Sequence, residues 1–103
     1  MPRNYDEVVK KLIDEAECEG YWPEIINDSE ENLEVEDSTT KQDMVDYATA
    51  ADEAIIRFSN DDGDKFSVYL VYGNMMEETI NDYSAKSVAD RICTLVAKHF
   101  EGR

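Results

Sequence analysis

The residue types that most often mark specialised sites are scarce in this chain of 103 residues. It has four glycines, two prolines, two cysteines and one histidine. The glycines stand alone at positions 20, 63, 73 and 102, which excludes a glycine-rich phosphate-binding loop. Two distant cysteines and one histidine do not supply the ligands of a structural zinc site. We expect no cofactor, no metal and reduced thiols, although Cys18 and Cys93 are enough for one disulfide.

Long apolar segments are missing as well. No apolar run approaches the roughly 20 residues that a membrane-spanning helix needs, and the N-terminal sequence MPRNYDEVVKK lacks the apolar region of a secretory signal. The hydrophobic fraction of 42% is nevertheless high enough for a folded core, because disordered chains are poorer in such residues. We therefore expect a single cytoplasmic domain over residues 1–103.

Basic residues are outnumbered by acidic ones. The chain has 25 aspartates and glutamates against 10 lysines and arginines, a net charge of −15. Residues 1–40 hold 13 acids and 3 bases, residues 41–64 hold 7 and 2, and residues 65–103 hold 5 of each. Direct binding to nucleic acid or to an anionic membrane is disfavoured, since both carry negative charge. A basic protein surface would be attracted instead.

The clearest structural pattern lies in residues 54–73. Two runs, AIIRFS and KFSVYLVY, alternate in side-chain type with a period of two, which predicts a pair of β-strands. The sequence NDDGD between them predicts a tight turn, with Gly63 at the position that needs a positive φ.

Three amphipathic helices are expected to accompany this hairpin. The first covers residues 5–19 with Asn4 as its cap and Gly20 at its end. The second starts from a capping box of Thr39 and Gln42 and ends near residue 52, and Ser87 caps the third. Their apolar stripes, at helical spacing, are Tyr5, Val8, Val9, Leu12, Ile13 and Ala16; Met44, Tyr47, Ala48 and Ala51; and Val88, Ile92, Leu95, Val96 and Phe100.

Two other segments carry weaker patterns. Residues 23–28 have the form of a short helix with Pro23 at its first position, while Leu33 and Val35 alternate with glutamates as in a charged edge strand. Six of the ten residues from 28 to 37 are acidic, which is typical of a solvated loop. Residues 77–84 are a candidate third strand.

These elements predict an α+β fold in two layers. An antiparallel β-meander of three or four strands would pack against two or three amphipathic helices. One face of the hairpin carries Ile55, Tyr69 and Val71 and is too apolar to be plainly solvated. We expect residues 21–37 or a partner to cover it.

No pattern predicts a catalytic site. The turn NDDGD alternates oxygen-bearing side chains like the start of a calcium loop, but it lacks the glycine and glutamate that an EF-hand needs at its sixth and twelfth positions. His99 is expected to be a structural residue in the apolar stripe of the last helix, on a different side from Cys93. We therefore do not expect an enzyme.

The leading functional hypothesis is a small interaction protein that binds a basic partner surface. Its sharpest form is a DNA mimic that inhibits a DNA-handling protein, with carboxylates in place of phosphates. The candidate partner-binding carboxylates are Glu7, Asp14, Glu17, Glu30, Glu31, Glu34, Glu36 and Asp37. Met75 and Met76 add a second candidate spot, for a partner or for a second copy of the chain in a homodimer.

Two alternatives belong to other classes. In one, the acidity is an adaptation to salt or for solubility and the function lies elsewhere, although the neutral C-terminal third fits this less well. In the other, the chain is a small enzyme or ligand-binding domain, which would need an apolar pocket with convergent polar groups. Size and charge also suggest an accessory protein of a phage or mobile element, a hypothesis that no particular residue supports.

Overall fold

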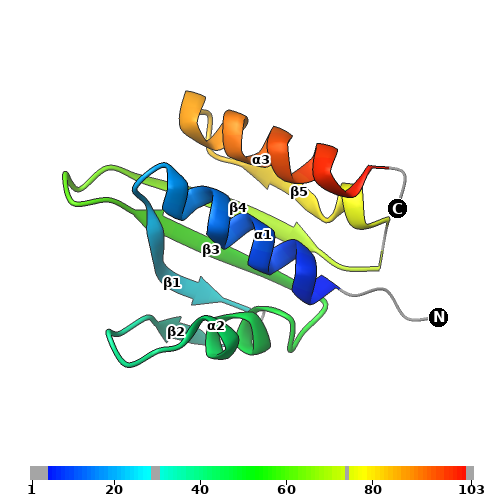
Figure 1. The fold of residues 1–103 in the computed structure, drawn as a ribbon. Helices are drawn as coiled ribbons and strands as arrows, with labels where there is room; N and C mark the ends of the chain where they lie inside the picture. The colour runs from blue at the N-terminus through cyan, green and yellow to red at the C-terminus, as the bar shows by residue number, and fades with distance from the viewer. Residues whose placement is uncertain (1–4, 29–30, 74, 102–103) are drawn as a thin grey trace.

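The computed structural model describes residues 5–28, 31–73 and 75–101, and it has the α+β architecture in two layers that the sequence predicts (Figure 1). The sheet has five antiparallel strands in the order β2-β1-β3-β4-β5, rather than three or four. In chain order the elements are α1 (Tyr5–Cys18), β1 (Trp22–Asn27), β2 (Asn32–Glu34), α2 (Lys41–Ala48), β3 (Glu53–Ser59), β4 (Lys65–Val71), the 3₁₀ turn η1 (Met76–Glu78), β5 (Ile80–Tyr83) and α3 (Ser87–Phe100).

The hairpin of β3 and β4 is confirmed and forms the centre of the sheet. Ile56 lies opposite Val68 and Phe58 lies opposite Phe66, and all four side chains are buried. The rings of Phe58 and Phe66 stack with their centroids 5.0 Å apart. The turn that joins the strands places Gly63 at a φ of +82°, a conformation that residues with a Cβ resist.

The first helix packs against the hairpin, and its predicted apolar stripe is confirmed. Tyr5 is half-buried, and the remaining members are fully buried: Val8, Val9, Leu12, Ile13 and Ala16. The helix ends at Cys18, and Gly20 follows at a φ of +86°, the conformation expected just past a helix end. The predicted cap, Asn4, lies outside the described residues.

The stripe of α3 is rotated from the predicted one. Ile92, Val96 and Phe100 are buried as expected, but Leu95 is 46% exposed. At about 100° per residue, the buried arc is centred between Ile92 and Cys93, and Leu95 lies outside it. The predicted cap is also wrong, because Ser87 is the first helical residue and Lys86 occupies the cap position without a side-chain cap bond.

The segment predicted as a short helix after Trp22 is instead strand β1. It pairs with β3, and Ile26 points into the core while Ile25 lies on the other face. Pro23 is accommodated next to a β-bulge between Pro23 and Ile25, where the ladder is already irregular. The edge strand predicted around Leu33 is confirmed as β2, although it is only three residues long.

The second helix is confirmed with shifted ends. Its capping box is formed by Thr40 and Asp43, one residue later than the predicted pair of Thr39 and Gln42, and the helix ends at Ala48. The candidate strand over residues 77–84 is confirmed in its second half as β5.

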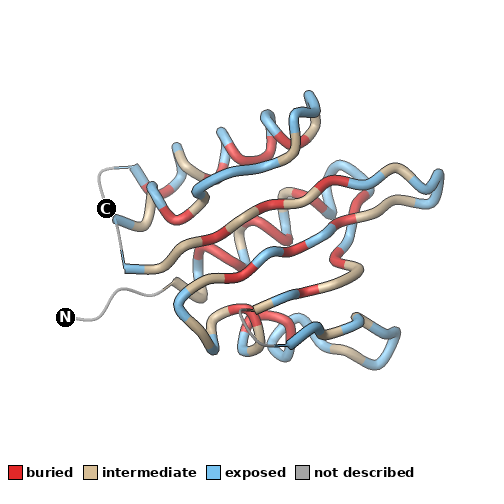
Figure 2. The backbone as a smooth tube through the Cα atoms, turned by 180° about the vertical axis from the view of Figure 1, so that it is seen from behind, coloured by how far each residue is buried: buried red, intermediate tan, exposed pale blue. Residues whose placement is uncertain are grey.

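The outer face of the sheet remains open. The described residues of the segment 21–37 do not cover it, because β1 and β2 extend the sheet sideways instead. Ile55 is 42% exposed, and Tyr69 and Val71 are half-buried. In the view from behind, buried residues alternate with exposed and half-buried ones along β3 and β4 (Figure 2).

Truncation of the two faces should have very different effects. Phe58→Ala should lower the free energy of unfolding by about 3–5 kcal/mol, because it leaves a cavity beside Phe66. Ile55→Ala, on the open face, should cost less than about 1.5 kcal/mol. Urea unfolding followed by circular dichroism measures both, and equal losses would contradict the two-layer arrangement.

Candidate functional site

One segment rich in acidic residues comprises β2, the loop that follows it and α2, and it lies at the β2 edge of the sheet (Figure 1). Residues 28–46 contain eight acidic residues and one basic residue, Lys41. We name six of these, all exposed in the structure, the acidic edge: Glu31, Glu34, Glu36, Asp37, Asp43 and Asp46.

Backbone and side-chain hydrogen bonds hold the loop of the acidic edge in place. The Val35 amide donates to the Glu24 carbonyl at 2.9 Å and so ties the loop to β1. The Thr39 amide donates to the Glu36 carbonyl at 2.9 Å, and the Glu36 amide donates to the Thr39 hydroxyl at 3.0 Å. The capping box of α2 follows directly. The carboxylates of this loop are therefore carried on a fixed backbone.

The cations near the acidic edge are already engaged. Lys41 forms ion pairs with Asp14 and Glu17 of α1, and the hydrogen bond with Asp14 raises the pKa of Lys41. Other ion pairs join Lys11 with Glu15, Lys86 with Asp64, and Arg91 with Glu19. Within the described residues, no lysine or arginine forms an ion pair with the acidic-edge carboxylates Glu31, Glu34, Glu36 and Asp37.

A groove of about 240 Å³ lies beside the loop of the acidic edge. Its apolar lining comes from Trp22 and Pro23 of β1, Val35 of the loop and Met44 of α2, and its acidic lining includes Glu17, Glu24, Glu36 and Asp37. Glu24 is compensated by Lys65 at 3.0 Å and Arg57 at 3.2 Å, and the hydrogen bond from Lys65 lowers its pKa. Trp22 is 43% exposed.

The structure brings only some of the predicted partner-binding residues together. Glu17, Glu36 and Asp37 line the groove, and Asp14 is joined to Glu17 through Lys41. Exposed Glu31 directly precedes β2 and exposed Glu34 is its last residue, and Glu7 is exposed near the start of α1; Glu30 lies outside the described residues. Met75, 41% exposed, and half-buried Met76 lie between β4 and β5, toward the other edge of the sheet.

Sequence reasoning missed the apolar part of this site. Pro23 was predicted to begin a short helix and Trp22 was not a candidate site residue, while Met44 was assigned to the core and is indeed only 8% exposed. The local sequence contains no signal for the groove, since its walls come from α1, β1, the β2–α2 loop, α2 and β3.

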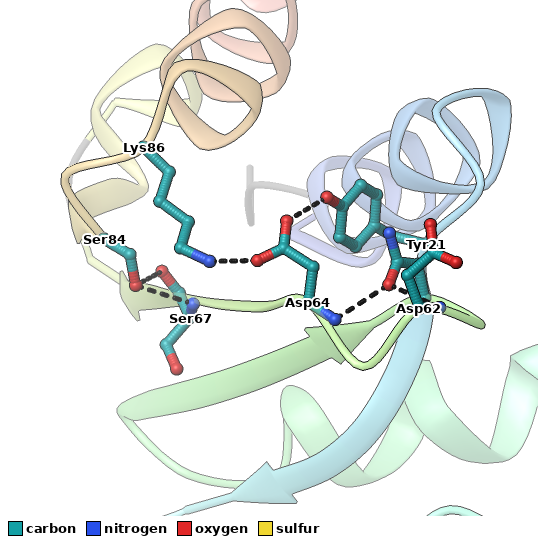
Figure 3. Close-up of polar contacts among 7 residues, drawn as sticks. Tyr21, Asp62, Asp64, Ser67, Ser84 and Lys86 are labelled. Atoms are coloured by element: carbon teal, nitrogen blue, oxygen red, sulfur yellow. Dashed lines mark hydrogen bonds and ion pairs between the residues drawn. The ribbon is translucent and has the colours of Figure 1, made fainter.

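The turn of the hairpin joins three parts of the chain (Figure 3). The Asn60 side chain accepts hydrogen bonds from the amides of Asp62 and Asp64 at 3.1 and 2.9 Å. The Asp64 carboxylate accepts from the Tyr21 hydroxyl and pairs with Lys86, and Lys86 lowers the pKa of Asp64. Across the described ranges, no group of three or more His, Cys, Asp or Glu side chains is arranged to hold a metal ion.

The thiols and the histidine lie apart. Both cysteines are free, Cys18 is exposed, and Cys93 is buried in α3, which raises its pKa to about 12. His99 was predicted to lie in the buried stripe of α3, and this prediction is wrong. It is exposed in the last turn of α3, with its ring 4.8 Å from that of Phe100.

Comparison of the chain with protein-family models, with curated proteins and with solved structures gave no match. Within the described segments, each helix is too short or too polar to cross a bilayer.

Substitution of Asp64 should reveal the role of the hairpin turn in stability. Asp64→Asn should lower Tm at neutral pH, because Lys86 loses its ionic partner. The lowered pKa means that this contribution is complete above the ordinary aspartate value of about 3.9 and is lost as the pH falls through the folded-state pKa. The Tm difference from the wild type should therefore shrink in acid. Thermal unfolding from pH 7 to pH 2 measures it, with Asp61→Asn as the control from the same turn.

The two thiols should differ in reactivity. A maleimide should label the native protein once, at Cys18, because Cys93 is 3% exposed and its raised pKa keeps it protonated. In urea both should be labelled. Intact-mass spectrometry counts the labels, and rapid labelling of a native Cys18→Ser variant would contradict the burial of Cys93.

Proposed function

We propose that the protein binds the basic surface of a partner protein through the acidic edge. The observation that supports this most directly is the uneven use of cations. Lysines and arginines compensate carboxylates on α1, on β1 and at the hairpin turn, whereas Glu31, Glu34, Glu36 and Asp37 have no described ionic partner. Carboxylates concentrated in this way create a negative potential that steers and orients a basic partner.

Charge density decides how closely the acidic edge matches DNA. Along an extended chain, carboxylates at alternate residues such as Glu34 and Glu36 are separated by about 6.6 Å. One DNA strand carries a phosphate for every ~3.4 Å of helix axis but winds around that axis, so a row with this spacing resembles the phosphates of a single strand, whereas the duplex has two strands. DNA mimicry therefore needs a second row of acids, for which Asp43 and Asp46 on the neighbouring helix are the candidates. We therefore propose a partner protein with a basic surface. The more specific form of this proposal is that the partner is a DNA-handling protein.

Charge-neutralising variants test the proposal. The protein is immobilised, incubated with lysate at low salt and eluted with a salt gradient, and the eluted proteins are identified by mass spectrometry. We expect basic proteins to elute as the salt rises, because screening weakens such contacts. The variant E31Q/E34Q/E36Q/D37N should capture at most about one tenth as much, the equivalent of ~1.4 kcal/mol.

A matched control separates local charge from net charge. The variant D61N/D62N/E78Q/E101Q removes the same four charges outside the acidic edge and should retain capture. Equal losses in the two variants, or capture that is insensitive to salt, would reject the acidic edge as the binding surface. Competition with short duplex DNA tests the narrower form, since a protein held through its DNA-binding surface should be displaced.

A further inference from the structure

The groove beside the acidic edge has a size that restricts its occupant. Its volume of about 240 Å³ is below the ~300–1,000 Å³ of typical small-molecule sites. A metabolite would be poorly enclosed, whereas one long side chain of a partner protein would fit. The groove is lined by α1, β1, the β2–α2 loop, α2 and the end of β3, and the hydrogen bonds of Val35, Glu36 and Thr39 hold the backbone of the loop.

The lining also specifies the charge of that side chain. Of the four carboxylates, Glu24 is held by Arg57 and Lys65, and Glu17 lies 3.6 Å from Lys41. Glu36 and Asp37 have no ion pair among the described residues and lie at the same groove. The occupant that complements this lining carries a positive charge.

The apolar lining favours arginine over a simple cation. Trp22 exposes 43% of its surface, and tryptophan is the aromatic residue that attracts cations most strongly. Pro23, Val35 and Met44 provide an apolar wall for an aliphatic stem. A guanidinium group is planar and weakly hydrated, so it can stack on an indole ring and still bind carboxylates in a way that an ammonium group cannot.

We propose that the groove binds an arginine side chain from a basic segment of a partner protein, with the guanidinium group on Trp22 and paired with Glu36 and Asp37. This inference rests on the proposed function and names the part of the basic partner that is recognised. The acidic edge supplies attraction over a broad surface, and the groove supplies the one position at which arginine is distinguished from lysine.

Trp22 is the only tryptophan of the chain, so its fluorescence reports on this groove alone. The probe is a capped Gly-Arg-Gly-Arg-Gly peptide, with the lysine peptide and the uncharged citrulline peptide as controls. We expect the arginine peptide to change the Trp22 emission with saturation, the lysine peptide to bind more weakly, and the citrulline peptide to have no effect. Identical curves for arginine and lysine would overturn the assignment of arginine.

Two variants of equal charge locate the site. E36Q/D37N should weaken binding of a dye-labelled arginine peptide by about tenfold or more, whereas D61N/D62N should change it by less than about twofold. Trp22→Leu, which keeps an apolar wall, should also weaken binding in the same anisotropy assay. Folding of each variant is checked by circular dichroism.

The outcomes separate this inference from the proposed function. The acidic edge is supported if the labelled peptide binds the wild type and does not bind E31Q/E34Q/E36Q/D37N. The groove assignment is nevertheless wrong if the peptide leaves the Trp22 emission constant and E36Q/D37N binds it as well as D61N/D62N does. If the quadruple variant also binds the peptide unchanged, both are wrong.

Discussion

The burial of one face of the β3–β4 hairpin is the constraint on which the rest of the structure depends. A domain of 103 residues has room for one core, and Phe58 and Phe66 are buried and stacked within it. Each helix packs its apolar stripe against that face, so the carboxylates lie on outer helix surfaces, in turns, at the sheet edge and, as Glu53 does, on the open face of the sheet. The acidic edge lies where the chain passes from the sheet to the helix layer, from just before β2 into α2.

The period of the apolar residues correctly predicted the helices and strands that bury one face and expose the other. The strands of the hairpin and helix α1 were predicted correctly because their patterns are long enough to distinguish the period of a strand from that of a helix. Strand β1 was missed because its few residues fit both periods and Pro23 suits a helix start. Its strand conformation comes from pairing with β3, a non-local interaction that no short window contains. The exposure of Leu95 was missed for the same reason, since it depends on which side of α3 packs against other elements.

The sequence predicted that the carboxylates of the candidate site are exposed, but it did not predict which side chains lie beside them. Exposure of carboxylates such as Glu36 and Asp37 follows from the cost of burying a charge. Which carboxylates stay uncompensated depends on tertiary structure, because Lys41 reaches back to α1 and Glu24 receives its cations from β3 and β4. An exposed tryptophan beside them could not be inferred, since tryptophan is usually largely buried.

The antiparallel pairing of β1 with β3 has a consequence for the order in which the molecule assembles. The β3–β4 hairpin closes over a five-residue turn, residues 60–64, whereas Asn27 meets Ile55 only after the chain has closed a loop over residues 28–54. Closing the longer loop costs more conformational entropy, so local contacts form sooner. The carboxylates of the acidic edge lie in the loop that the pairing of β1 with β3 closes, and this loop and β1 also form part of the groove. Local opening of the β1–β3 pair would therefore dismantle the binding surface while the hairpin stays intact, and a bound partner would stabilise that closure.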